Sequence, residues 1–259
     1  MSSPNKSTIE NKKPMVIPSA PLAANPMLPA VVTRKLRPIL FSTPMVEAIL
    51  SGRKSQTRRL VNTDSNLDFM GFVLGDEKRA GSIGFGYLNH YETVEVVKAK
   101  YNVGDVLWVR ETFAETCDEM GSPVIAYKTG KPRLITACNG KYELCKETDT
   151  EWSIDNYPAC GNWKPSLFMP FFACRIFLKI TDIRVERLQE ISIEDAKKEG
   201  VEFKEIEDVP FYKDYEYNKH IHISSRSSFA TLWYKINGQK SWDKNPFVWV
   251  VEFEVCPKP

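Results

Sequence analysis

The chain has 259 residues, of which 42% are hydrophobic and 26% are charged. This composition is ordinary for a globular protein and argues against a chain that is disordered throughout. No stretch approaches the roughly 20 consecutive apolar residues that a membrane-spanning helix requires, so we expect no membrane partner. The net charge of +2 is also too small for a histone-like or polybasic protein.

Residues 1–35 are predicted to form a disordered, proline-rich tail. A continuous helix is excluded because proline lacks a backbone N–H and interrupts the segment, at Pro4, Pro14, Pro18, Pro21, Pro26 and Pro29. The same prolines break the apolar run that a secretory signal needs. We therefore expect a cytoplasmic protein with six reduced cysteines. Because the cysteine spacing fits no zinc motif, we expect no metal, and a metal site formed by the four cysteines between residues 117 and 160 is the alternative. We expect no other cofactor.

Order is predicted to begin with a short buried strand over residues 39–41. Thr43 is then expected to cap a helix whose first residue is Pro44, since the missing proline N–H would be unsatisfied at that position anyway. Gly52 would end this helix. Residues 52–61 follow as a polar, basic exit into a second strand.

The middle of the chain alternates between strands and irregular segments. Residues 62–92 are rich in Gly, Asn and Asp and predict a loop or irregular hairpin, and residues 114–165 predict an insertion that decorates the core. Apolar runs and period-2 alternation predict four further strands, over residues 94–97, 106–109, 174–188 and 247–255. In the third of these the alternation slips near Thr181 and Asp182, which predicts a bulge or bend.

Two helices are predicted in the C-terminal third. Ser192 opens the first, with Asp195 at the capping-box position and Gly200 just past its end. The second is indicated by apolar residues at i, i+3, i+4 and i+7 from Phe229. Several non-sequential strands with three short helices predict a single α+β domain over residues 36–259. Its most economical form is a small, closed or nearly closed β-barrel flanked by the helices.

Charge is distributed unevenly along the chain. Residues 34–59 carry seven basic side chains against the single acid Glu47, whereas residues 202–216 carry six acids against two lysines. Several basic residues crowd into the loop over residues 53–59, beside hydrogen-bonding Ser, Gln and Thr side chains. This mixture suits phosphate neutralisation with polar recognition, which nucleic-acid binding requires. The alternative is a solvated basic surface without a ligand.

Lys54 and Thr57 lie three residues apart in this basic loop and are a candidate catalytic pair. A threonine hydroxyl is a poor nucleophile until a base removes its proton. Neighbouring arginines disfavour a further cation, so the pKa of Lys54 is expected to fall toward the range of a useful base. A nearby carboxylic acid would then supply the proton for a leaving amine.

Five blocks of the sequence resemble phage- and prophage-borne proteins of the ASCH domain family. The blocks are PILFSTPMVEAILSGRKSQTRRLV (38–61), GDVLWVRETFA (104–114), WKPSLFMPFFACRI (163–176), RVERLQEISIEDAKKEGV (184–201) and LWYKINGQKSWDKNPFVWVVEF (232–253). They cover most of residues 38–255 and leave the tail outside. The resemblance implies a PUA-like β-barrel and a link to RNA, with the insertion making this chain longer than the small enzymes of the family.

The resemblance also implies an activity. Small bacterial proteins that resemble this domain are amidohydrolases that remove the acyl group from N4-acetylcytidine, and other members have been described as ribonucleases. The amidohydrolases use an R-K-x-x-T loop, which Arg53, Lys54 and Thr57 match, so Lys54 would be the base and Thr57 the nucleophile. They also use a glutamate on a later helix, for which Glu199 is the best match and Glu194 a rival proton donor.

The leading hypothesis is a protein that binds RNA or a modified nucleoside. Its pocket would lie between the basic loop, the strand end at Arg110 and Glu111, and the helix 192–199. Arg110 would contact a base edge or pair with Glu111. The phosphates would be held by Arg53, Arg58 and Arg59.

Two alternatives come from other classes of function. One is an amidohydrolase that deacylates N4-acetylcytidine-like nucleosides with Lys54, Thr57 and a glutamate. The other is a non-catalytic phage protein with a structural or host-interaction role. In each case we expect the protein to act in the cytoplasm of a phage-infected or lysogenic bacterium.

Overall fold

The computed structural model describes residues 34–62, 68–72, 82–86, 95–117, 122–130, 133–138, 141–147 and 162–259. The predicted tail lies outside the described residues, except for its last two positions. The described part combines many strands with a few short helices, which confirms the α+β class. In these ranges no helix has the length and apolar character that crossing a membrane would need.

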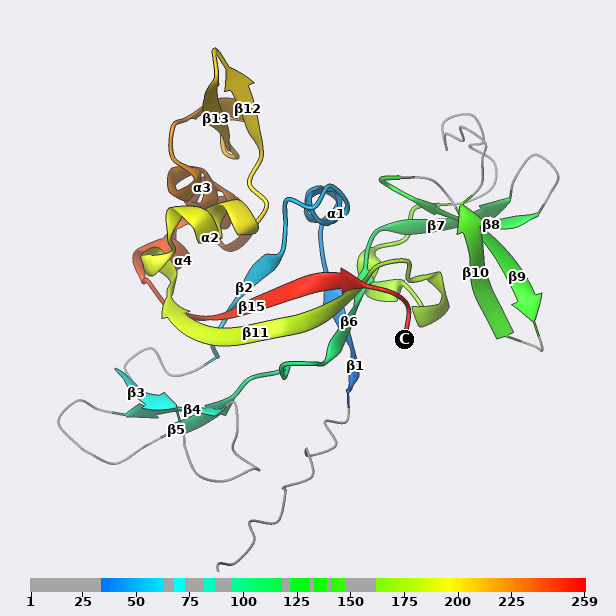
Figure 1. Ribbon diagram of the computed structural model, residues 1–259, viewed down its shortest axis with the longest axis horizontal. Helices are drawn as coiled ribbons and strands as arrows, with labels where there is room; N and C mark the ends of the chain where they lie inside the picture. Colours follow the sequence, from blue (N-terminus) through cyan, green and yellow to red (C-terminus); the bar gives the residue numbers. More distant parts are fainter. Residues whose placement is uncertain are drawn as a thin grey trace, which may run out of the picture. The chain divides into compact units, whose positions relative to one another are not determined.

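A five-stranded sheet with the order β1-β6-β11-β15-β2 forms the centre of the fold (Figure 1). Its strands are β1 (Leu36–Leu40), β6 (Val106–Arg110), β11 (Phe177–Arg187), β15 (Phe247–Cys256) and β2 (Gln56–Leu60). β1 runs parallel to β6, and the other neighbours are antiparallel. The sheet does not close into the predicted barrel, because the edge strands β1 and β2 do not pair with each other.

β11 and β15 form the longest strand pair of this sheet (Figure 1). Their register shifts between Ile180 and Asp182. A bulge adds a residue to one strand and reverses which later side chains face the core. The bulge predicted near Thr181 and Asp182 is therefore confirmed.

Helices cover both faces of the central sheet. They are α1 (Thr43–Leu50), α2 (Ile193–Lys198), α3 (Ser225–Asn237) and α4 (Gln239–Asp243), with the 3-10 turns η3 (Ser166–Phe168), η4 (Phe171–Ala173) and η5 (Leu188–Glu190). Alternation along β15 separates two cores. Trp249 and Val251 pack in the core that α1 covers, and Val248 and Val250 pack in the core under α2 and α3.

The predicted and observed helix caps agree at α2 and differ by one residue at α1. α1 starts at Thr43, but its N-cap is Ser42, so the prediction that Thr43 is the cap is wrong by one residue. Ser192 caps α2 as predicted, because its Oγ accepts a 3.0 Å hydrogen bond from the Asp195 N–H. The Asp195 carboxylate does not complete a capping box and instead binds arginines of the candidate site.

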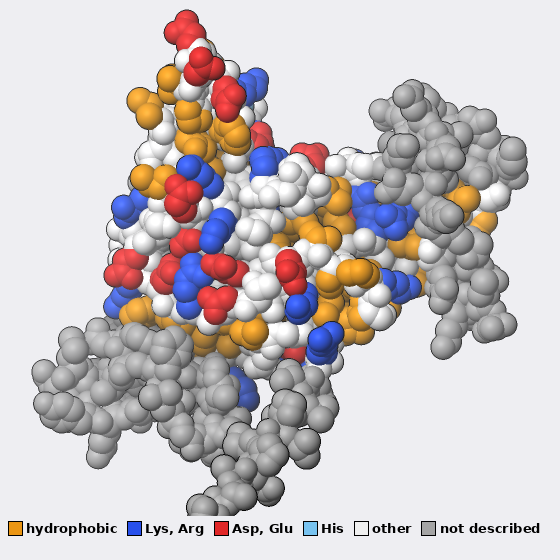
Figure 2. All heavy atoms as spheres, viewed as in Figure 1, with side chains coloured by type: hydrophobic (Ala, Val, Ile, Leu, Met, Phe, Trp, Pro, Cys, Tyr) orange, Lys and Arg blue, Asp and Glu red, His pale blue; other side chains and the backbone are white. Residues whose placement is uncertain are grey.

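Three smaller sheets accompany the central one. They are β3 (Asp68–Phe72), β4 (Ser82–Gly86) and β5 (Glu95–Lys98); β7 (Phe113–Cys117), β8 (Pro123–Tyr127), β9 (Arg133–Cys138) and β10 (Lys141–Glu147); and β12 (Phe203–Ile206), β13 (Val209–Asp214) and β14 (Lys219–His222). β3 and β4 pair with a register shift, as in the irregular hairpin predicted for residues 62–92. Figure 2 shows acidic side chains at the tip of the β12–β13 hairpin, within the acidic segment 202–216.

Candidate functional site

The segment predicted as a basic loop is mostly a strand. Residues 56–60 form β2, which pairs with β15 along its whole length, and of the predicted loop only residues 53–55 belong to the connection between α1 and β2. Thr57 and Arg58 are buried, and Arg59 is partly buried. Pairing with β15 fixes the directions of these side chains, so they are held against the fold instead of being free in solvent.

Lys54 and Glu199 form a buried ion pair beside the start of this strand. The Lys54 Nζ lies 2.9 Å from Glu199 Oε2 and donates a second hydrogen bond, of 2.8 Å, to the Glu199 carbonyl oxygen. The two side chains are only 1% and 5% exposed. Their backbones also meet in an isolated β-bridge. The structure thus brings together the lysine and the glutamate that the family resemblance matched.

Gly200 allows this close approach. Its φ of +87° lies in the left-handed region, which glycine adopts at low cost. A Cβ on this residue would lie 2.8 Å from the Cβ of Lys54 and 2.9 Å from the Cβ of Ala48. The Lys54 N–H also donates a 2.9 Å hydrogen bond to the Ala48 carbonyl oxygen. The ends of α1 and α2 are therefore packed directly against Lys54.

The pKa of Lys54 is lowered, chiefly because burial disfavours the charged amine. Glu199 opposes this shift, and Arg59 and Arg58 add to it by a smaller amount. The direction agrees with the sequence-based expectation, but the main cause does not. Neighbouring arginines are visible in the sequence, whereas the burial of Lys54 depends on residues more than 140 positions away.

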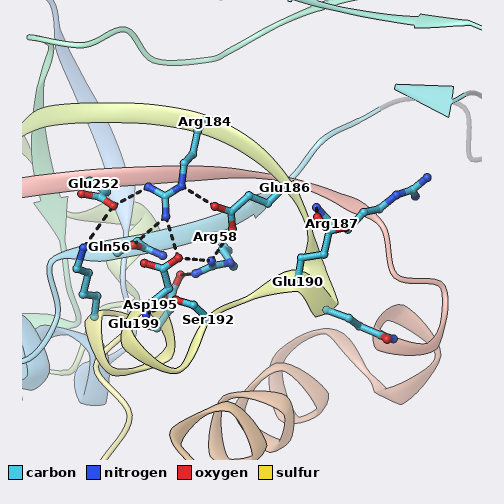
Figure 3. A network of polar contacts seen from close by, with 12 residues as sticks. Gln56, Arg58, Arg184, Glu186, Arg187, Glu190, Ser192, Asp195, Glu199 and Glu252 are labelled. Atoms are coloured by element: carbon cyan, nitrogen blue, oxygen red, sulfur yellow. Dashed lines mark hydrogen bonds and ion pairs between the residues drawn. The ribbon is translucent and has the colours of Figure 1, made fainter. Parts of the chain in front are cut away.

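Arg58 is enclosed by three carboxylates (Figure 3). Its Nη1 lies 3.1 Å from Glu199 Oε1, and its Nη2 lies 2.8 Å from Glu186 Oε2 and 3.4 Å from Asp195 Oδ2. The rigid guanidinium fork suits such bridging. Because the Arg58 side chain has no exposed surface, we assign it to holding Glu199 in place and not to the phosphate contact predicted for it.

A second arginine, Arg184, extends this network. Its Nη1 lies 2.6 Å from Glu252 Oε1, its Nη2 lies 2.9 Å from Asp195 Oδ2, and its Nε lies 2.5 Å from Glu186 Oε1. Asp195 and Glu186 therefore each bind both arginines, and Figure 2 shows acidic and basic side chains next to one another over β11. This network is not predicted from the sequence. Its only local signal is that Arg184 and Glu186 are two residues apart on a strand and so share a face.

A cavity of about 250 Å³ lies beside Glu199, between α1, β2 and α3. We call it the glutamate cavity. Its lining includes Thr57 and Glu199 together with the rings of Phe229 and Trp233. The three predicted catalytic residues are thus neighbours, since Lys54 contacts Glu199, and Glu199 and Thr57 line the same space.

Arg110 and Glu111 lie elsewhere. Glu111 accepts two hydrogen bonds of 2.9 Å from Arg175, which takes the place of the ion pair considered for Arg110 and Glu111. Arg110 lies over the Trp108 ring, 5.4 Å from its centroid, and lines a second cavity of about 510 Å³ together with Arg59. The single pocket predicted from the sequence is therefore not formed: Arg110 lines one cavity, Thr57 and Glu199 line another, and Glu111 lines neither. The two cavities share Arg59 and Leu60.

Two other predicted residues lie at the edge of the site. Arg53 donates a 3.2 Å hydrogen bond to the Gly200 carbonyl oxygen, which ties the connection after α1 to the end of α2. Glu194 is 74% exposed and pairs with Lys197 on its own helix. Of the two candidate proton donors, only Glu199 lines the glutamate cavity.

The thiols of Cys174 and Cys256 are not joined in disulfides, and burial raises the pKa of Cys174 to about 12. Among the residues that the structure describes, no group of three or more His, Cys, Asp or Glu side chains is placed to hold a metal ion. Comparison of the chain with models of protein families, with curated proteins and with solved structures found no match.

Proposed function

We propose that this protein binds a modified nucleoside, free or within RNA, with its base in the glutamate cavity. The supporting observation is the lining of that cavity, where a hydroxyl and a carboxylate lie beside two aromatic rings, those of Thr57, Glu199, Phe229 and Trp233. Proteins that take a base out of a strand read it by hydrogen bonds to its edge and by packing against such rings. The volume of about 250 Å³ is below the roughly 300–1,000 Å³ of drug-sized ligand sites, which suits a base.

We further propose that the chain is a long phage- or prophage-type ASCH protein with a PUA-like fold, acting in the bacterial cytoplasm. The R-K-x-x-T spacing from Arg53 to Thr57 supports this assignment. So does the contact of Lys54 with the glutamate that follows α2, because the family resemblance implies a lysine and a glutamate at one site.

Thr57→Val is expected to weaken the binding of N4-acetylcytidine about three- to tenfold. Valine keeps the shape of threonine but removes the hydroxyl, and one lost hydrogen bond costs about 0.5–1.5 kcal/mol. Isothermal titration calorimetry of the full-length protein measures the difference. Ser55→Ala is the matched control, because Ser55 is two residues away and is not part of the cavity lining.

Equal affinities for the wild type and Thr57→Val would place the ligand outside this cavity. Failure to bind N4-acetylcytidine, both as a nucleoside and within an RNA oligonucleotide, would overturn the proposal. That result would favour the non-catalytic structural or host-interaction role.

Amide hydrolysis is a second candidate function, favoured by the buried amine of Lys54 and its 2.9 Å contact with Glu199. In this reaction, neutral Lys54 accepts the Thr57 hydroxyl proton, and the Thr57 oxygen bonds to the amide carbonyl carbon. The proton taken by Lys54 then passes to the Glu199 carboxylate, and Glu199 donates it to the leaving nitrogen as the C–N bond to the base breaks. Water finally releases the acyl group from Thr57 as a carboxylic acid.

The rate of this hydrolysis is expected to rise with pH, with a midpoint below the ordinary lysine pKa of 10.5. The neutral amine is the active form, and the lowered pKa of Lys54 increases its fraction at a given pH. The measurement is kcat/KM for cytidine release as a function of pH. Glu194→Gln should leave the profile unchanged. Turnover that survives both Lys54→Ala and Thr57→Val would exclude this mechanism without affecting the binding proposal.

A further inference from the structure

The second cavity exists because the central sheet is open. The edge strands β1 and β2 are not joined by a backbone ladder, and the Arg59 Nη2 instead donates a 2.9 Å hydrogen bond across to the Leu40 carbonyl oxygen. Residues of both edge strands line the cavity of about 510 Å³. We call it the seam cavity.

The charged side chains that line the seam cavity are all basic. Four basic side chains contribute to it, those of Arg59, Lys98, Lys100 and Arg110, and no acidic side chain is among its described lining residues. This differs from the network around Arg58, where carboxylates surround each arginine. A hollow lined by one sign of charge concentrates ions of the opposite sign.

Arg110 provides a separate indication of a missing partner. Its Nε is buried and has no hydrogen-bond acceptor among the residues that the structure describes. A buried donor without an acceptor costs about 1–3 kcal/mol, so native proteins rarely leave one. Burial also lowers the pKa of Arg59 on the same wall. An anionic ligand would relieve both costs, by accepting from Arg110 and by neutralising Arg59.

Apart from Asn62, the remaining lining is apolar and aromatic. Tyr101 and Trp249 are buried with exposures of 7% and 8%, and Ile183 and Val251 lie beside them. The volume of about 510 Å³ falls within the roughly 300–1,000 Å³ of sites for small organic ligands. The cavity thus offers cations for a phosphate and a flat apolar wall for a ring.

We infer that the seam cavity is a second ligand site, which binds a nucleoside phosphate, with the phosphate at Arg110 and Lys100 and the ring against Tyr101 and Trp249. This inference does not depend on the proposed function. The two cavities share Arg59 and Leu60, but none of the residues assigned to catalysis lines the seam.

Calorimetric titration of the full-length protein with ADP tests this site, with adenosine and inorganic pyrophosphate as partial ligands. ADP is expected to bind more tightly than either, and less tightly as ionic strength rises. Arg110→Gln should weaken ADP binding about tenfold or more, as expected for lost hydrogen bonds to a charged group. Lys100→Gln, at an exposed position that tolerates change, should weaken it about two- to fivefold.

The matched controls are Lys240→Gln, at an exposed position of α4, and Thr57→Val in the glutamate cavity, and neither should change ADP binding. No ADP binding, or unchanged binding in both Arg110→Gln and Lys100→Gln, would overturn the site. Adenosine or pyrophosphate binding as tightly as ADP would overturn the nucleoside phosphate as its ligand. If only the proposed function is wrong, ADP still binds at the seam cavity. N4-acetylcytidine then either does not bind or binds equally well to the wild type and Thr57→Val.

Discussion

Replacing Glu199 by glutamine is expected to lower the free energy of unfolding by about 3–5 kcal/mol. Glutamine has nearly the same shape, so the packing is kept and only the charge is removed. Glu199 Oε2 and Oε1 accept from Lys54 and Arg58, whose side chains are 1% and 0% exposed. Without the carboxylate, Lys54 loses its ion-pair partner and Arg58 keeps only Glu186 and Asp195, and a charge buried without its partner is the costly state.

Urea-induced unfolding of the wild type and Glu199→Gln measures this loss. Glu194→Gln is the matched control, because Glu194 belongs to the same helix but is 74% exposed. We expect it to change the stability by less than about 0.5 kcal/mol. Lys54→Met combined with Glu199→Gln should destabilise by less than the sum of the two single variants, since the residues are in contact. Equal effects of the two glutamate variants would show that the ion pair contributes nothing.

Local elements of the fold were predictable because their signals are local. Ser192 and Gly200 mark the ends of α2 through capping chemistry that needs only neighbouring residues. The slip in alternation near Thr181 likewise marks the bulge in β11. The error at Thr43 has the same origin, since Ser42 and Thr43 are both good caps and the sequence does not separate them.

The closure of the sheet was not predictable in this way. Alternation indicates which side chains of a strand are buried, but not whether two edge strands come close enough to pair. In the structure the edges β1 and β2 are linked through the Arg59 side chain and Leu40, with a cavity between them. The prediction of a closed or nearly closed barrel assumed backbone pairing where a side chain makes the contact.

The residues of the candidate site also fall into those that local sequence signals identify and those that only distant contacts identify. Lys54 and Thr57 could be selected by their spacing, and Glu199 was selected only through the family resemblance, because 145 residues separate it from Lys54. The role of Arg58 could not be predicted, since its partners Glu186 and Asp195 come from other elements. From the sequence, Arg58 is one of several clustered basic residues that could bind a phosphate. Only the folded structure shows that carboxylates already pair with it.

Gly200→Ala is expected to lower the free energy of unfolding by about 2–5 kcal/mol. The φ of +87° costs an L-residue roughly 1–2 kcal/mol. The new methyl would also lie 2.8 Å from the Lys54 Cβ and 2.9 Å from the Ala48 Cβ. Both are backbone-fixed atoms that no rotamer change can move, so the helix ends must separate, at an overpacking cost of about 1–3 kcal/mol. This displacement should also draw Glu199 away from Lys54 and weaken N4-acetylcytidine binding.

Gly52→Ala isolates the backbone part of this effect. Gly52 has a similar φ of +72°, but a Cβ there would meet nothing within 4 Å. Its substitution should therefore cost only the roughly 1–2 kcal/mol of the left-handed conformation and leave ligand binding unchanged. Urea unfolding and calorimetry of both variants give the comparison. Equal losses of stability in the two variants would show that the close packing of Gly200 on Lys54 does not hold the Lys54–Glu199 pair together. The pair would then depend on its own electrostatic attraction and on Arg58.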